Sequence, residues 1–231
     1  MRTRPNRLRK YAEVETELAT LGSLDSPKYM LESYGEKFEG EGGSMVPFAL
    51  RVIAAELPAH RGNPTVALDA LFALTMRCKS VVARLVQGED EAGNKPGPDD
   101  AAPALALWRG RSRKVQYVIG NCLLLSKDYG LALSTFAKIL KAEPENAGLC
   151  YAIGRIALEL GDIELAEVYF NQAAAMAGST PEAQAIGQGL LEIARGNVAE
   201  AVSERPADSV YLDTYGLSAS PLELLVQHAA E

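Results

Sequence analysis

The sequence predicts an all-α fold, a solenoid of antiparallel helix pairs, and two observations lead to that prediction. The 231-residue chain is 48% hydrophobic and 23% charged, and it is rich in Ala, Leu and Glu, which lose little on entering a helix. GNCLLLSKDYGLALSTF at 120–136 is followed by GRIALELGDIELAEVYF at 154–170, and the two align without a gap. A unit repeated at this spacing indicates stacked copies of one helical hairpin.

The two copies carry small, small and large side chains at positions 8, 20 and 24 of a 34-residue unit. A small residue lets the neighbouring helix approach closely, and a large one fills the seam between the helices. Pro144 ends the first copy, because proline cannot continue a helix. This order is the tetratricopeptide (TPR) pattern. Its structural positions are Gly120, Ala132 and Phe136 in the first copy and Gly154, Ala166 and Phe170 in the second.

A first TPR-like helix pair is predicted upstream, at 47–87. Gly62-Asn63-Pro64 reproduces the turn, Ala67 the second small position and Leu71 the large one. We expect Pro58 to distort the end of the first helix. The second helix continues to about Gln87, which is longer than usual for a TPR helix.

The stretch GEDEAGNKPGPDDAAP at 88–103 is acidic, rich in Gly and Pro, and without periodicity. It predicts a mobile loop, followed by the two in-phase TPR units at 104–180.

The first 46 residues predict a helix and an irregular crossing segment. NRLRKYAEVETELATLG places Leu8, Tyr11, Leu18 and Leu21 on one stripe and ends at Gly22. SLDSPKYMLESYGEKFEGEGG then leads to a glycine-rich turn.

Residues 181–231 predict an incomplete TPR unit and a C-terminal cap. Gly189, Gly196 and Ala201 continue the pattern, but Pro206 follows Ala201 after only five residues. PLELLVQHAAE at the end favours a short helix. Two interpretations stay open: an unusual cap, or an altered or truncated version of a longer array.

Charge and cysteine usage narrow the class of protein. A net charge of -7 and a pI near 5.1 argue against a general nucleic-acid binder. Three scattered cysteines suit a reducing, cytoplasmic compartment. No apolar run approaches the length of a membrane span, so we expect no direct membrane insertion.

Little in the sequence supports catalysis. A catalytic triad or a Cys-His pair would need one of the two histidines, His60 or His228, and no Cys or His spacing resembles a zinc site. GEGG at 40–43 lacks the Lys-Ser/Thr of a phosphate loop. We therefore expect no enzyme activity, no catalytic residue, no cofactor, no metal and no small-molecule substrate.

A TPR array offers instead the face formed by the first helix of each repeat, where a peptide or helix can bind. Helical spacing puts Lys114, Tyr117 and Asn121 on that face in the first unit, and Tyr151 and Arg155 in the second. TPR co-chaperones hold chaperone C-termini with a clamp of Lys and Asn. Asn121 fits one clamp position, but Ala152 stands where a second Asn is needed.

The basic run RGRSRK at 109–114 is a second candidate contact, through Arg109, Arg111 and Arg113. It suits phosphates or an acidic partner; the alternative is a solvated helix start. Four positive charges at a helix N-terminus oppose the macrodipole, which favours a role in binding.

Four stretches resemble the C-terminal TPR region of the TRAPP complex subunit twelve family, also called tetratricopeptide repeat protein fifteen. They are GSLDSPKYMLESY, GEGGSMVPFALRVIAAEL, LWRGRSRKVQYVIGNCLLLSKDYGLAL and AIGRIALELGDIELAEVYF. GSMVPF and NCLLLSKDY are the specific pieces, since ordinary TPR proteins need neither. The resemblance runs from about Arg7 to Ala201. It departs from the family in the shortened unit at 196–206 and in the absence of a long N-terminal extension.

The resemblance implies a non-catalytic scaffold subunit of the TRAPP III tethering complex. That complex promotes exchange on a Rab GTPase in ER–Golgi vesicle transport and in autophagy, and the exchange chemistry belongs to its small core subunits. The implied partners are the large subunits eight and eleven, with the core contacted indirectly, at the cytoplasmic side of ER–Golgi and Golgi membranes. The alternative is a peptide-binding TPR co-chaperone or adaptor.

Overall fold

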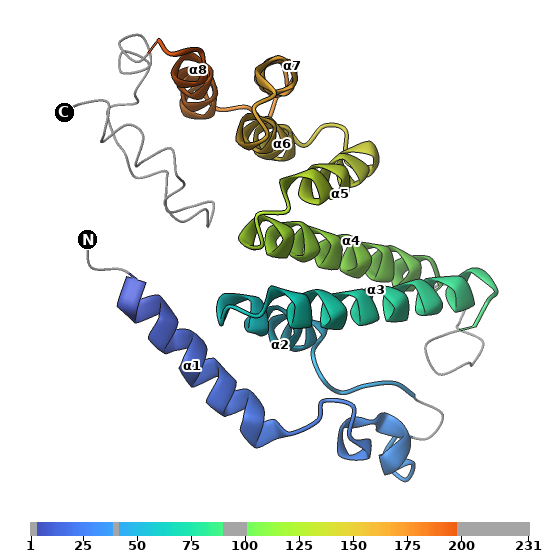
Figure 1. Ribbon diagram of the computed structural model, residues 1–231. Coiled ribbons are helices and arrows are strands. Elements are labelled where there is room, and N and C mark those ends of the chain that lie inside the picture. The colour runs from blue at the N-terminus through green and yellow to red at the C-terminus, as the bar shows by residue number, and fades with distance from the viewer. Residues whose placement is uncertain (1–3, 39–41, 90–100, 198–231) are drawn as a thin grey trace. The chain divides into compact units, whose positions relative to one another are not determined.

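The computed structural model describes residues 4–38, 42–89 and 101–197, with side chains from Tyr11 onward (Figure 1). The chain divides into two compact units, residues 1–139 and 140–231. Within the described residues the regular elements are helices, accompanied by an isolated antiparallel bridge between Met30 and Ser44.

In its described residues, the first unit contains four complete α-helices, two short 3-10 helices and most of a fifth α-helix. The α-helices are α1 (Arg4–Leu21), α2 (Phe48–His60), α3 (Pro64–Val86), α4 (Ala101–Leu125) and α5 (Tyr129–Ala142), the last of which crosses the division between the units. The 3-10 helices are η1 (Pro27–Tyr29) and η2 (Leu31–Tyr34).

The N-terminal helix α1 packs on α2. It ends before Gly22, as predicted, and Gly22 has the positive φ of 70° common after a helix. The ring of Tyr11 stacks on that of His60 at a centroid distance of 4.4 Å. Arg61 Nε lies 3.3 Å from a carboxylate oxygen of Glu15.

Two arginines, one buried in α2 and one on α3, hold the crossing segment in place by hydrogen bonds. Arg51 is only 7% exposed, and its guanidinium donates to Asp25 Oδ1 at 2.6 Å, to the Leu24 carbonyl at 2.9 Å and to Ser44 Oγ at 2.8 Å. Arg77 of α3 donates to the same Asp25 oxygen at 3.2 Å. These hydrogen bonds lower the pKa of the Asp25 carboxyl, with Arg51 as the main cause.

The α2–α3 pair lies where the upstream unit is predicted. Ala67 and Leu71 are completely buried, at the second small position and the large position of the pattern. Pro58 lies in the last turn of α2, which ends two residues later at His60. The second helix, α3, has 23 residues, in accordance with the length expected from its sequence.

The start of α4 corrects two expectations. The helix begins at Ala101, so the last three residues of the stretch predicted as a loop are helical; residues 90–100 of that stretch lie outside the described residues. The basic run at 109–114 therefore lies two turns inside a 25-residue helix rather than at its start. The argument from the helix macrodipole no longer applies, because that effect fades within the first turn.

The seam between α4 and α5 is formed by Gly120, Ala132 and Phe136. A Cβ placed on Gly120 would overlap the ring of Phe136, so only glycine allows this approach. Phe136 is 3% exposed and Ala132 is completely buried.

The second unit repeats this seam with α6 (Ala147–Glu159), α7 (Ile163–Ala174) and α8 (Pro181–Arg195). A Cβ on Gly154 would lie 2.5 Å from Cε1 of Phe170, and Ala166 is completely buried. Helix α8 also approaches the same ring, at Gly187, where a Cβ would lie 3.4 Å from Phe170 Cδ1. The six residues at the structural positions of the pattern therefore lie in the two seams.

Of the incomplete TPR unit predicted at 181–231, the described residues include the first helix, α8. Gly189 is buried in α8, and Gly196 ends the helix with a φ of 87°. The shortened second half, including Ala201 and Pro206, and the expected C-terminal cap lie outside the described residues.

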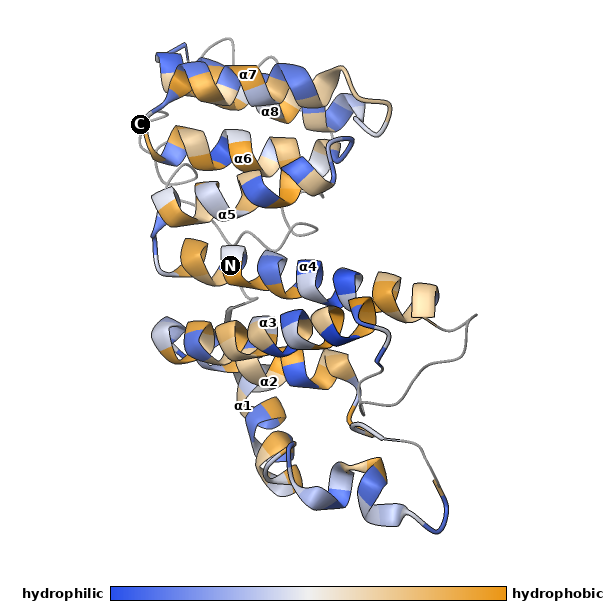
Figure 2. Ribbon diagram, turned by 90° about the vertical axis from the view of Figure 1, so that its right-hand side faces the viewer, coloured by the Kyte–Doolittle hydropathy of each residue, from blue (hydrophilic) through white to orange (hydrophobic). Residues whose placement is uncertain are grey.

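The helices are amphipathic, with hydrophobic and hydrophilic residues alternating in short bands (Figure 2). None of the helices in the described ranges is long and apolar enough to cross a membrane.

Candidate partner-binding surface

The predicted contact residues belong to two helices in different units. Lys114, Tyr117 and Asn121 lie on α4 in the first unit, and Tyr151 and Arg155 lie on α6 in the second. Each set is brought together by its own helix, because residues three and four apart share one helix face.

On α4, two of the three side chains are available for contact. Lys114 and Asn121 are exposed. Tyr117 is half-buried, and its ring lies 6.3 Å from that of Phe136, so part of it belongs to the seam.

On α6, Tyr151 and Arg155 serve the packing of their unit. The hydroxyl of Tyr151 forms a 2.8 Å hydrogen bond with Ser179 Oγ, and its ring lies 6.0 Å from that of Phe170. Arg155 is half-buried; burial lowers the pKa of its guanidinium, and the nearby Glu159 partly opposes this effect. Truncating either residue would disturb the unit as well as any contact it makes.

The basic run is arranged by the helix into different surroundings. Arg109 is exposed, whereas Arg111 and Arg113 are half-buried. The guanidinium of Arg111 lies 4.4 Å from the ring centroid of Trp108 and 5.2 Å from that of Phe48. The two rings meet edge to face at 5.9 Å, so Arg111 is braced by aromatic rings from two helices.

The aromatic contact lies where α2 and α4 run side by side in the same direction. Phe48 at the start of α2 meets Trp108 and Arg111, and eight residues later Glu56 is close enough to α4 to influence Cys122. Ile53, one turn before Glu56 on the same face of α2, is 46% exposed. This pair of first helices is the unit-one part of the expected binding face.

The sequence interpretation missed two features of this face. Ile53 carried no signal, since a single apolar residue in an amphipathic helix is expected in the core. The bracing of Arg111 had a partial signal, because Trp108 stands three residues earlier. Phe48 is 63 residues away in the sequence and could not be assigned to it.

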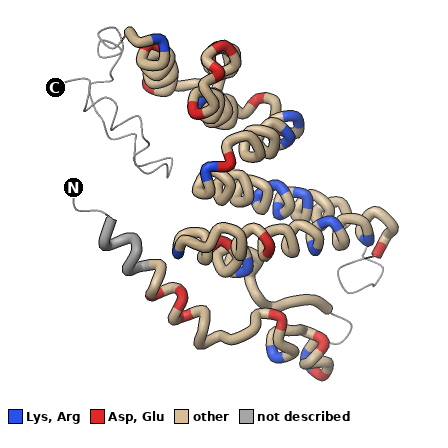
Figure 3. Tube along the Cα trace, in the orientation of Figure 1, with Lys and Arg blue, Asp and Glu red and all other residues tan. Residues whose placement is uncertain are grey.

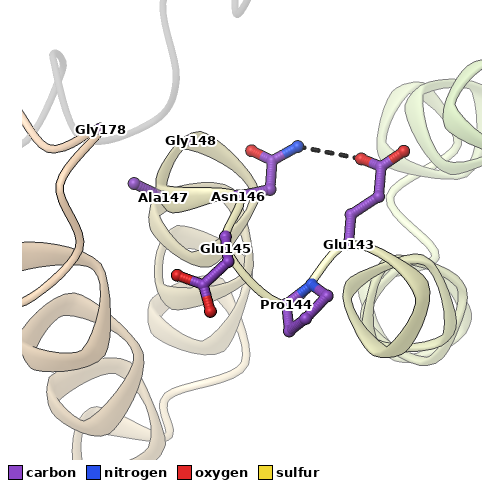
Figure 4. A pocket seen from close by; sticks show the side chains of 7 residues that line it. All are labelled: Glu143, Pro144, Glu145, Asn146, Ala147, Gly148 and Gly178. Atoms are coloured by element: carbon purple, nitrogen blue, oxygen red, sulfur yellow. Dashed lines mark hydrogen bonds between the residues drawn. The ribbon is translucent and has the colours of Figure 1, made fainter.

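The second unit has an open hollow where α6 begins (Figure 4). Glu143, Asn146 and Gly178 are among the residues that line it. The Asn146 side chain donates to Glu143 Oε2 at 3.1 Å and accepts from the Leu149 N–H at 3.0 Å, which caps α6. The side chains of Asn146 and Glu143 thus stabilise the turn between two repeats.

The three cysteines and His60 take part in packing. Cys78, Cys122 and Cys150 are completely buried. Burial, with a smaller contribution from Glu56, raises the pKa of the Cys122 thiol to about 11, so this group is protonated at neutral pH and is a poor nucleophile. His60 lies against Tyr11 and 3.2 Å from Glu56, and His228 lies outside the described residues. Residues 11–38, 42–89 and 101–197 contain no group of three acids, cysteines or histidines able to hold a metal ion.

Known proteins resemble this chain in two ways. Residues 123–190 match the family model described as tetratricopeptide repeat. The human trafficking protein particle complex subunit 12 is 39% identical over 164 residues, which cover 70% of this chain and 22% of that protein. The mouse protein of the same name is also 39% identical over 164 residues, with 70% of this chain and 21% of that protein covered.

The chain spans about a fifth of the length of the relatives it matches. The repeat match and the observed helix pairs confirm the predicted fold class, an all-α solenoid of TPR type. The chain belongs to the family of trafficking protein particle complex subunit 12 and contains a tetratricopeptide-repeat region.

Proposed function

We propose that this chain acts as a non-catalytic TPR scaffold within a trafficking protein particle (TRAPP) complex. The observation that carries the proposal is the 39% identity to subunit 12 over 164 residues. The buried cysteines and the packed His60 support a structural role over a catalytic one.

The finer assignment within this proposal is TRAPP III, with the large subunits eight and eleven as direct partners. The chain would then take part in ER–Golgi vesicle transport and in autophagy, and would reach Golgi membranes through its complex. It would contribute a surface on which other subunits assemble, while the exchange reaction on the Rab GTPase takes place elsewhere in the assembly.

The contact surface that we propose lies on the first helices of the helix pairs. On α4 the exposed Lys114, Asn121 and Arg109 are the residues of choice, because they can be changed without opening a seam. Tyr117 and Arg113 on α4 are half-buried and contribute from the margins. Tyr151 and Arg155, which are half-buried on α6, are the proposed contact residues of the second unit. A helix or extended segment laid along such a face is a common mode of recognition by helical repeats.

The experiment is purification of the tagged chain from cells of its source organism, with mass spectrometry of the bound proteins. We expect the large TRAPP subunits together with the small core. The double variant Lys114→Ala/Asn121→Ala should recover less of them, whereas a double variant on the exposed side of α5, Leu131→Ala/Lys138→Ala, serves as a control. Recovery of chaperones in place of TRAPP subunits, or of no subunit at all, would overturn the proposal.

A further inference from the structure

The middle of α4 carries an unbalanced positive charge. The helix has four basic residues and no acidic one, as Figure 3 shows along its length. Within the part of the chain whose side chains the structure describes, Arg109, Arg111 and Lys114 form no ion pair. Other arginines of the same unit, Arg51 and Arg77, do have a carboxylate partner. Among the described residues, these three cations are therefore not neutralised by a carboxylate of the chain.

Two of these cations lie on a face with apolar ends. Leu107, Arg111, Lys114 and Val118 are spaced four, three and four residues apart and so share one side of the helix. Leu107 is 54% exposed, so its side chain is available for contact. At about 1.5 Å per residue the face extends over about 16 Å, or three helical turns.

On this face, Arg111 is the side chain whose conformation is restrained before a partner binds. Its contacts with Trp108 and Phe48 restrain the side chain before any ligand arrives. An arginine stacked on aromatic rings keeps the N–H groups at its edge for a carboxylate, and less rotational freedom is lost on binding.

We propose that the face of α4 formed by Leu107, Arg111, Lys114 and Val118 binds an acidic amphipathic helix of a partner subunit, with Arg111 as its anchor. The complementary segment carries two carboxylates one turn apart, between two apolar side chains. This inference rests on the proposed scaffold function, and it adds the chemistry of the partner and the place where it binds.

The charge of the chain and of this face favours an acidic protein helix over a nucleic acid or an anionic membrane as the partner. A nucleic-acid-binding domain is typically basic overall, whereas this chain has a net charge of -7. Attachment to an anionic membrane usually takes a cluster of about four to eight cations, whereas this face presents two. A short acidic segment needs only local complementarity, since charges beyond about 8 Å are screened at physiological salt.

The test compares four forms of the whole chain in the same purification from cells: wild type, Arg111→Gln, Lys114→Gln and Lys79→Gln. Lys79 is exposed and lies on α3, so its change removes one charge that is not among the four proposed residues of α4. We expect Arg111→Gln to reduce recovery of the partner subunit by about tenfold or more, Lys114→Gln by about threefold and Lys79→Gln by less than twofold. Thermal unfolding of each form verifies that the fold is retained, and Lys114→Gln keeps the test valid if Arg111→Gln lowers stability.

A second measurement identifies the ligand chemistry. Carbodiimide joins an amine directly to a carboxylate that touches it, so Lys114 in the purified complex should be cross-linked to an Asp or Glu of a partner subunit. Equal recovery with all four forms, or no such cross-link, would overturn the inference while leaving the scaffold function intact.

If the wild-type chain recovers no TRAPP subunit, the scaffold function fails, and a direct binding measurement decides the inference alone. The probe is a helical peptide with leucines at positions 1 and 12 and glutamates at 5 and 8, compared with its glutamine counterpart. Binding of the glutamate peptide that is lost in Arg111→Gln supports the site. Absence of binding, or binding to vesicles of anionic phospholipid instead, overturns it.

Discussion

The two helix pairs that contain the sequence repeats have the same packing in their interior, but the charges of their residues are opposite in sign. In both, a glycine of the first helix lies against a phenylalanine of the second: Gly120 against Phe136, and Gly154 against Phe170. Yet residues 101–142, with α4 and α5, carry seven basic residues and one acidic residue, whereas residues 147–174, with α6 and α7, carry one basic residue and four acidic ones.

The difference shows which positions the fold controls. The seam positions are held by close packing, where one extra methyl group causes an overlap. The exposed positions of a helix tolerate most side chains, so the two repeats are free to differ in charge there. Binding specificity is therefore to be sought where the repeats disagree, which in this chain is first of all the basic face of α4.

The largest expected effect comes from removing the seam phenylalanines. Phe136→Ala and Phe170→Ala should each lower the free energy of unfolding by about 3–5 kcal/mol, because each leaves a cavity in the core. Phe170 should be at the upper end, since α8 also packs against it at Gly187. Chemical denaturation measures both, with Val168→Ala, at a 60% exposed position, as the control. An unchanged midpoint for either phenylalanine variant would mean that the seam is wrongly placed.

Filling the glycine positions should have a smaller effect of the same kind. Gly120→Ala and Gly154→Ala place a methyl group in the space that a phenylalanine ring occupies. The overlap should lower the free energy of unfolding by about 1–3 kcal/mol, partly offset by the better helix propensity of alanine. Gly110→Ala is the matched control, because it lies inside α4 with no atom near the new methyl group. That control should gain up to about 1 kcal/mol, and a loss of stability there would contradict this account.

The turns between paired helices provide a still smaller comparison. Gly161 has a φ of 78°, and at the corresponding turn position Lys127 has a φ of 61°. Because this conformation costs a residue with a Cβ roughly 1–2 kcal/mol, Lys127→Gly should stabilise the chain by up to about 1 kcal/mol and Gly161→Ala should destabilise it by a similar amount. Lys138→Gly, in the body of α5, should instead lose about 1 kcal/mol. Thermal melts of the three variants would detect these signs.

The smallest expected effect concerns acid stability. The pKa of Asp25 is lowered in the folded chain, so its contribution is fully present above the unfolded pKa, about 3.9, and is lost as the pH falls through the folded value. The effect is limited, because the Asp25 side chain is 67% exposed. We expect Asp25→Asn to melt below wild type at pH 6, and the difference to shrink as the pH falls below 4. A difference that stays constant with pH would assign the role to packing alone.

Much of the fold was predictable because its signals are local or periodic. The positions of Gly154, Ala166 and Phe170 follow from a repeat that every stacked hairpin must satisfy. The binding face was predictable only in part. The spacing of Lys114 and Asn121 placed two exposed residues on one side of α4, but the same spacing named Tyr151, whose hydroxyl and ring are occupied within its own unit.

The sequence by itself determined the helix pairs, their seams and the family, because periodicity, small residues and local motifs are written along the chain. The tertiary structure alone decided how the basic run is used. A helix start at Ala101 placed the run inside α4, and Phe48 came from another helix to brace Arg111 beside Trp108. Contacts between residues far apart in the sequence depend on how whole helices pack, and no local pattern specifies them.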